Sequence, residues 1–163
     1  MSRILVVEDD AATRRMLGVV LRKRGHKPAL AASFEVGVKM LAQVASGRFS
    51  VALIDCTLSR KDARGVTQLD AEAGIDLAKM IRAAAQEHGV TIKIVAGSAY
   101  LEDDDRRARA LQASHVLLTK PYKPAELFKA IETPLAAQEA KDSPAETNPT
   151  GGNPSQDTPQ GAD

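Results

Sequence analysis

The chain has 163 residues, a net charge of +1 and 44% hydrophobic residues, which predicts one globular domain with some additional chain. Its one cysteine, Cys56, excludes a scaffold held together by internal disulfides, and no apolar run is long enough to cross a bilayer. The apolar run before the acidic Glu8 has only four residues, too few for a signal peptide, so we expect a cytoplasmic protein without a membrane segment.

Five short apolar segments are typical of strands that are buried on both faces of a sheet. They span residues 3–7, 27–32, 50–55, 90–97 and 115–121. Segments with helical spacing of apolar residues lie between these strands and after the last one. Strands and helices that alternate in this way predict an α/β fold with a doubly wound parallel sheet, and five units are too few for an eight-fold barrel.

The expected helices each have a distinct apolar face. The first carries Met16, Leu17, Val20 and Leu21, and Asp10 is expected to cap its N-terminus. The second is expected to begin after Ser33, with an inner face made of Phe34, Val38, Leu41, Ala42 and Ala45. The third, over 74–89, carries Leu77, Ala78, Ile81 and Ala85. A very polar helix at 103–112 and a final one at 125–131 follow.

Polar residues with a common chemistry stand where the predicted strands end. Glu8 and Asp9 follow the first strand, Asp55 ends the third, and Ser98 and Lys120 follow the fourth and end the fifth. Ligands bind beyond the carboxyl ends of the strands in an open sheet of this kind, so these side chains are expected to gather at one edge. The carboxylates suit Mg²⁺, and a lysine and a hydroxyl beside a cation suit phosphoryl oxygens. Asp55 alone could be a helix cap, a turn residue, a metal ligand or a nucleophile.

Three other nucleotide or phosphate sites are excluded by missing residues. The chain has no G-x-x-x-x-G-K-[ST] loop of a Walker-type ATPase, and the segment after the first strand lacks the glycines of dinucleotide binding. A phosphatase of the haloacid dehalogenase type would need a second aspartate at the position of Thr57.

The stretches "ILVVEDDAATRR", "VALID", "SA" and "LLTKPY" resemble the receiver domain of bacterial two-component response regulators, and the resemblance extends over residues 2 to about 133. It implies a flavodoxin-like fold with strand order 2-1-3-4-5. Asp55 would accept a phosphoryl group from a histidine of a sensor kinase or phosphotransfer protein. Asp9, Asp55 and the backbone carbonyl of Thr57 would bind Mg²⁺, with Glu8 acting through a water.

The same resemblance assigns the remaining site residues. Ser98 would hydrogen-bond the phosphoryl group, Lys120 would pair with another of its oxygens, and the Lys120–Pro121 peptide bond would be cis.

The chain departs from the family pattern in three places. Ser59 stands where a proline is common, which predicts a less rigid loop. An insert at about 58–73 could be a tolerated surface loop, or a lid, a partner-docking element or a short extra helix. Leu117 replaces the aromatic residue of the family's switch, a role that Tyr100 could take over.

We therefore expect a receiver domain over 1–138 and a disordered Pro/Gly/Ser/Thr-rich tail over 139–163. The protein would be a stand-alone switch that acts as an enzyme only on its own phosphorylation and dephosphorylation. Its partners would be a kinase or phosphotransfer protein and an unknown downstream protein, without direct DNA binding. A receiver-like interaction module that is independent of phosphorylation is the alternative.

Overall fold

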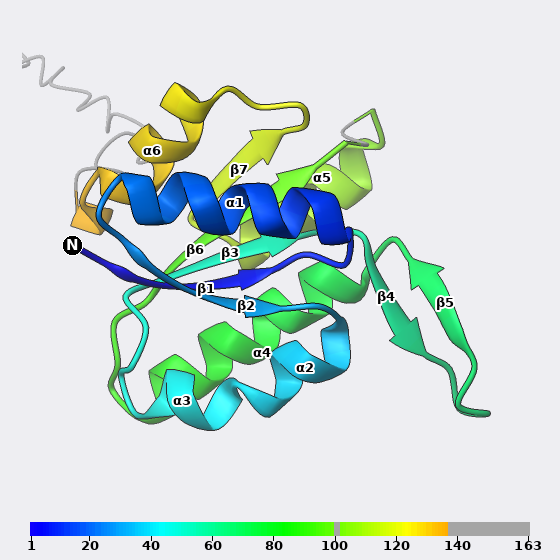
Figure 1. The fold of residues 1–163 in the computed structure, drawn as a ribbon. Helices are drawn as coiled ribbons and strands as arrows, with labels where there is room; N and C mark the ends of the chain where they lie inside the picture. The colour runs from blue at the N-terminus through cyan, green and yellow to red at the C-terminus, as the bar shows by residue number, and fades with distance from the viewer. Residues whose placement is uncertain (100–101, 137–163) are drawn as a thin grey trace, which may run out of the picture.

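The computed structural model describes residues 1–99 and 102–136, so the predicted tail and Tyr100 lie outside the described residues. A five-stranded parallel sheet in the order β2-β1-β3-β6-β7 forms the centre of the molecule (Figure 1). Its strands are β1 (Arg3–Val7), β2 (Lys27–Ala31), β3 (Val51–Asp55), β6 (Lys93–Ser98) and β7 (Val116–Thr119). Counted within this sheet the order is 2-1-3-4-5, so the predicted fold class is confirmed.

Helices cover both faces of the sheet (Figure 1). One face packs against α1 (Ala11–Lys23) and α6 (Pro124–Glu132), and the other against α2 (Phe34–Lys39), α3 (Leu41–Ala45), α4 (Ala73–Glu87) and α5 (Asp104–Ala113). Successive strand residues point to opposite faces, so Leu5 and Val7 enter one hydrophobic cluster and Ile4 and Val6 the other. This arrangement explains why the strands are apolar at nearly every position. No helix among the residues that the structure describes is both long and apolar enough to span a membrane.

Two details of the predicted helices are wrong. The helix expected over 34–45 is divided at Met40 into α2 and α3, which shifts the phase of the inward face. Val44 is therefore fully buried while Ala42, expected inside, is exposed. In α1, Leu17 and Leu21 are buried as expected, but 54% of Met16 is exposed because it lies at the edge of the apolar face.

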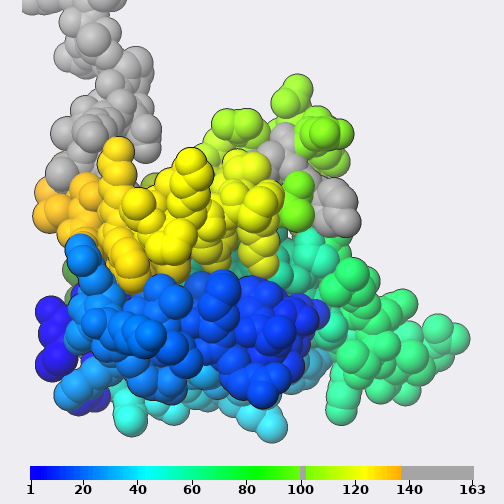
Figure 2. Space-filling model, turned by 45° about the horizontal axis from the view of Figure 1, so that its top comes forward, coloured from blue at the N-terminus to red at the C-terminus, as the bar shows by residue number. Residues whose placement is uncertain are grey.

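The insert after the third strand of the sheet forms an antiparallel hairpin of β4 (Leu58–Lys61) and β5 (Thr67–Asp70), neither a loop nor a short helix. The connection is stabilised locally. The Asp62 carboxylate accepts hydrogen bonds from the backbone N–H groups of Arg64 and Val66, and Gly65 adopts a positive φ of 81°. The hairpin projects from the body of the molecule at the carboxyl edge of the sheet (Figures 1 and 2).

Candidate functional site

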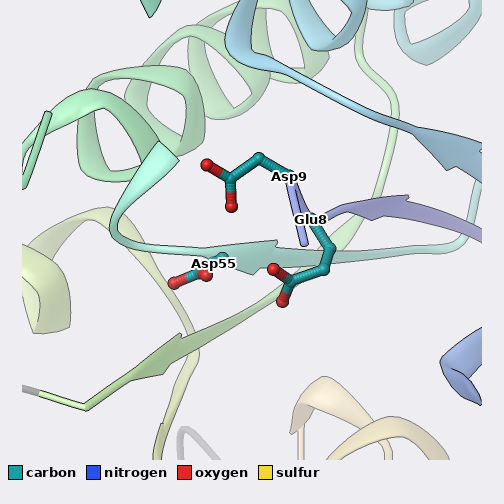
Figure 3. A group of neighbouring side chains, drawn as sticks. All are labelled: Glu8, Asp9 and Asp55. Atoms are coloured by element: carbon teal, nitrogen blue, oxygen red, sulfur yellow. The ribbon is translucent and has the colours of Figure 1, made fainter. Parts of the chain in front are cut away.

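Three carboxylates converge at the carboxyl edge of the sheet (Figure 3). Glu8 and Asp9 directly follow β1, and Asp55 is the last residue of β3, the strand that pairs with β1. One oxygen from each of the three side chains lies within 4.8 Å of the others. Two adjacent parallel strands that both end in acids are sufficient to build this cluster.

Lys120 joins two of the three carboxylates. Its Nζ donates to Asp55 Oδ2 at 2.9 Å and to Glu8 Oε2 at 3.0 Å. Burial disfavours the charged ammonium, but the hydrogen bonds and charges of Asp55 and Glu8 outweigh burial and raise the pKa of Lys120. The Lys120–Pro121 peptide bond is cis, which confirms the prediction. The ammonium therefore stays protonated and holds the ends of β1 and β3 to the segment after β7.

Glu8 is the most deeply buried acid of the cluster, with 3% of its surface exposed. Burial raises the pKa of its carboxyl group, while the hydrogen bond from Lys120 lowers it and the charge of Asp55 raises it. Its Oε1 accepts the backbone N–H of Asp10 at 3.1 Å. Arg14 donates to the backbone carbonyls of Glu8 and Asp9, which fixes the turn between β1 and α1.

Thr57 and Ser98 both lie near Asp55 at the carboxyl edge of the sheet. The backbone N–H of Thr57 donates to Asp55 Oδ1 at 3.1 Å. Ser98 is buried at the end of β6, one residue beyond Gly97, the register partner of Asp55. The backbone carbonyl of Ser98 accepts the N–H of Lys120 at 2.8 Å, so the adjacent strand ends are directly linked. The predicted site residues thus all lie at the same edge of the sheet.

Gly74, the second residue of α4, lies directly against the phosphoacceptor candidate. A Cβ at this position would stand 1.8 Å from the backbone carbonyl oxygen of Asp55 and 2.6 Å from Cys56 Cα. The Gly74 N–H donates to the carbonyl of Cys56 at 2.9 Å. Only glycine permits this approach, so the start of α4 and the position of Asp55 are fixed together.

Two polar contacts beside the cluster were missed from the sequence. Ser59, expected in a loosened loop, is part of β4 and donates to Asp9 through both its backbone N–H and its hydroxyl. Arg106, on the polar helix α5, is only 6% exposed and donates to Thr57 Oγ1 at 2.8 Å and to the carbonyl of Ala71. The helix composition gave no signal that one of its arginines would be buried, because that depends on the path of the insert.

Cys56 is buried beside Asp55, and burial raises the pKa of its thiol to about 11. We expect the folded protein to react with iodoacetamide at pH 8 at less than about a hundredth of the rate of an ordinary thiol, because the thiolate is scarce and shielded. Mass spectrometry of the alkylated protein measures this rate, with the urea-unfolded protein as control. Rapid alkylation of the folded chain would contradict the packing role and revive a redox role.

The donor set fits a hard divalent cation. Mg²⁺ prefers oxygen ligands from one or two carboxylates and keeps several waters. Such ligands can come from Asp9, Asp55 and the carbonyl of Thr57. Glu8 lies close enough to contact the cation through a water molecule. The ammonium of Lys120 offsets part of the negative charge of the three acids through its ion pairs with Glu8 and Asp55.

Comparisons with known proteins agree with this geometry. The sequence profile of the response regulator receiver domain matches residues 4–132. A search of curated protein sequences finds no match. Among solved structures, the receiver domain of a sensor histidine kinase from Pseudomonas aeruginosa PAO1 is 29% identical. The two chains superpose with a TM-score of 0.62 over 83% of this chain and 98% of that one. That structure has a magnesium ion coordinated in its active site cleft.

Two further structures are similar in fold. A CheY-like receiver domain protein from Methanospirillum hungatei JF-1 is 23% identical, with a TM-score of 0.63 over 86% of this chain and 98% of its own. A receiver domain protein from Clostridium thermocellum is 15% identical, with a TM-score of 0.66 over 86% of this chain and 99% of its own.

Proposed function

The chain belongs to the response regulator receiver family, and from this membership we propose that it is a switch controlled by Mg²⁺-dependent phosphorylation of Asp55. One observation carries the proposal: Asp55 lies next to Lys120 and to the carboxylates of Glu8 and Asp9 at one edge of the sheet. The protein would act by binding a partner in one phosphorylation state or by passing the phosphoryl group along a relay.

In the proposed reaction, a carboxylate oxygen of Asp55 attacks the phosphorus of a phosphohistidine on a sensor kinase or phosphotransfer protein. The P–O bond of an acyl phosphate forms, the P–N bond breaks, and the imidazole leaves with the electron pair and takes up a proton. Asp55 is suited to this role because its side chain is partly accessible and is held at both oxygens, by Lys120 and by the Thr57 N–H.

The other residues would stabilise charge on the transferred group. Lys120 can turn from Asp55 Oδ2 toward a phosphoryl oxygen, since its ammonium lies next to the reacting carboxylate. We assign the second phosphoryl contact to the Ser98 hydroxyl. Asp9, Asp55 and the Thr57 carbonyl would hold Mg²⁺, with Glu8 acting through a water. The cation would supply electrostatic stabilisation of the phosphoryl oxygens.

A pocket beside Lys120 gives a partner side chain access to this edge. It has a volume of about 350 Å³ and is lined by Thr13, Met16, Ala99, Lys120, Pro121 and Tyr122. Its lining combines apolar surface with one ammonium, which suits a phosphohistidine, because the flat face of the ring can pack on apolar side chains and the phosphoryl group is anionic. The exposed side chain of Met16 then contributes to partner binding instead of to the core.

The test is labelling of the full chain with a small phosphodonor such as acetyl phosphate. We expect incorporation of one acid-stable, base-labile phosphoryl group with Mg²⁺ present and none with EDTA, because the carboxylates would otherwise repel the donor. Intact mass spectrometry measures the labelling, and re-addition of excess Mg²⁺ to the EDTA sample is the control. Labelling that is unaffected by EDTA would contradict the proposed site. Failure of every donor, together with an absence of Mg²⁺ binding, would favour the interaction module that is independent of phosphorylation.

A further inference from the structure

The hairpin is connected to the carboxylate cluster through one residue, Ser59. Its backbone N–H donates to Asp9 Oδ2 at 3.0 Å, and its hydroxyl donates to the same oxygen at 2.7 Å. Ser59 and Asp9 are 50 positions apart in the chain, so this contact exists only because β4 passes alongside the turn after β1. The position four residues after Asp55 thus contributes two donors where a proline would contribute none.

These two hydrogen bonds restrict the rotation of the Asp9 carboxylate. Both are made to one oxygen, and a carboxylate held at one oxygen can still offer the other to a cation. Hydrogen bonds to a ligating carboxylate orient it, and their loss typically weakens metal binding by about 10- to 100-fold. Ser59 therefore does not bind the cation itself but holds Asp9, a proposed cation ligand, in position.

The strand that carries Ser59 is itself firmly held. The guanidinium of Arg60 forms ion pairs with Asp70 at 2.7 Å and with Asp76 of α4 at 2.8 Å. The backbone N–H of Lys61 donates to the carboxylate of Glu35 in α2 at 2.7 Å. Because its neighbours are fixed to two helices, Ser59 presents its donors to Asp9 from a defined position, and a displacement of the hairpin would displace them.

We propose that Ser59 is a positioning residue for Asp9, and that through it the β4–β5 hairpin sets the affinity of the site for a divalent cation. The inference rests on the proposed function, since it concerns the same cation. It assigns the insert a role that the sequence left open: the hairpin is a support for the site, and anything that moves the hairpin changes cation binding. By linkage, cation binding must in turn stabilise the hairpin in its present position.

The test compares two variants of nearly equal shape in the full chain. Ser59→Thr keeps the hydroxyl, whereas Ser59→Val has the same branched outline without it, and both keep the backbone N–H. Mg²⁺ titration followed by amide shifts in ¹⁵N-labelled protein gives the dissociation constant. We expect the threonine variant to remain within about threefold of the wild type and the valine variant to bind about tenfold more weakly. Ser59→Ala replaces the valine variant if valine prevents folding.

A second measurement separates positioning from a purely structural role. We expect Mg²⁺ to slow amide hydrogen exchange in 58–61 and 67–70 of the wild type and the threonine variant, but not of the valine variant. Equal Mg²⁺ affinity in the threonine and valine variants overturns the inference, as does hairpin exchange that does not respond to Mg²⁺ in the wild type. If the wild type binds no Mg²⁺ and is not labelled, the proposed function fails as well. If it binds and is labelled while the two variants agree, only this inference fails.

Discussion

Replacing Asp55 with asparagine is expected to reduce phosphoryl incorporation below detection. The amide has nearly the shape of the carboxylate and its oxygen can still accept the Thr57 N–H, so the surroundings of residue 55 are retained. An amide is not a nucleophile toward phosphorus at neutral pH, however, and it removes one anionic ligand from the proposed cation site. Intact mass spectrometry of the Asp55→Asn variant after incubation with acetyl phosphate and Mg²⁺ measures the effect.

Asp10→Asn is the matched control for this variant. Asp10 is a neighbouring acid at the same edge of the sheet, but its carboxylate caps α1 by accepting the N–H of Thr13 at 2.7 Å. Asparagine is an equally good N-cap, so the folded state and the labelling should both be preserved. Circular dichroism establishes that both variants are folded. Labelling that persists in Asp55→Asn would place the phosphoacceptor at another residue.

Gly74→Ala is expected to destabilise the fold by at least about 3 kcal/mol and to impair labelling at Asp55. The added methyl group would meet backbone atoms, the Asp55 carbonyl oxygen and Cys56 Cα, and backbone cannot turn aside as a flexible side chain can. Either the start of α4 or the end of β3 must move, and both carry groups that define the site. Urea unfolding measures the stability, and the same phosphodonor assay measures the labelling of the fraction that folds.

Gly18→Ala provides a control with the same chemical change in another helix. Gly18 lies inside α1, where a Cβ would meet the side-chain atom Leu30 Cδ1 at 3.1 Å. The Leu30 methyl group can shift, and alanine is more favourable than glycine inside a helix by about 1 kcal/mol. The net change in the free energy of unfolding should therefore be within about 1 kcal/mol of zero. If Gly74→Ala were as mild as Gly18→Ala, the close contact between α4 and Asp55 would not determine the position of the site.

The sheet and its ligand edge were predictable because they depend on local pattern and on topology. Short segments that are mostly apolar identified the five strands of the sheet, and right-handed crossovers restrict how such strands can be ordered. Once the strands are placed, the residues that follow them must share one edge. Glu8, Asp9, Asp55 and Lys120 are therefore brought together by connectivity, and this required no knowledge of side-chain packing.

The contacts that the sequence did not reveal depend on the path of the insert. The segment from Leu58 to Asp70 has no strong alternation of apolar and polar residues, and therefore gave no clear strand signal. Its pairing as a hairpin is stabilised by the hydrogen bonds of Asp62 in the turn and by the ion pair of Arg60 with Asp70. The roles of Ser59 and Arg106 follow only from where that hairpin and the start of α4 lie. The predicted 34–45 helix is divided at Met40 into α2 and α3, which both pack against α4.

The arrangement of one ammonium among three carboxylates also governs how a donor approaches. The cluster has an excess of negative charge, and a phosphodonor is itself an anion, so at short range the metal-free protein repels the molecule that would modify it. We expect this electrostatic repulsion to act on every small anionic phosphate in solution. We therefore expect the metal-free form to react slowly with small anionic phosphodonors, even though the Asp55 side chain is partly accessible.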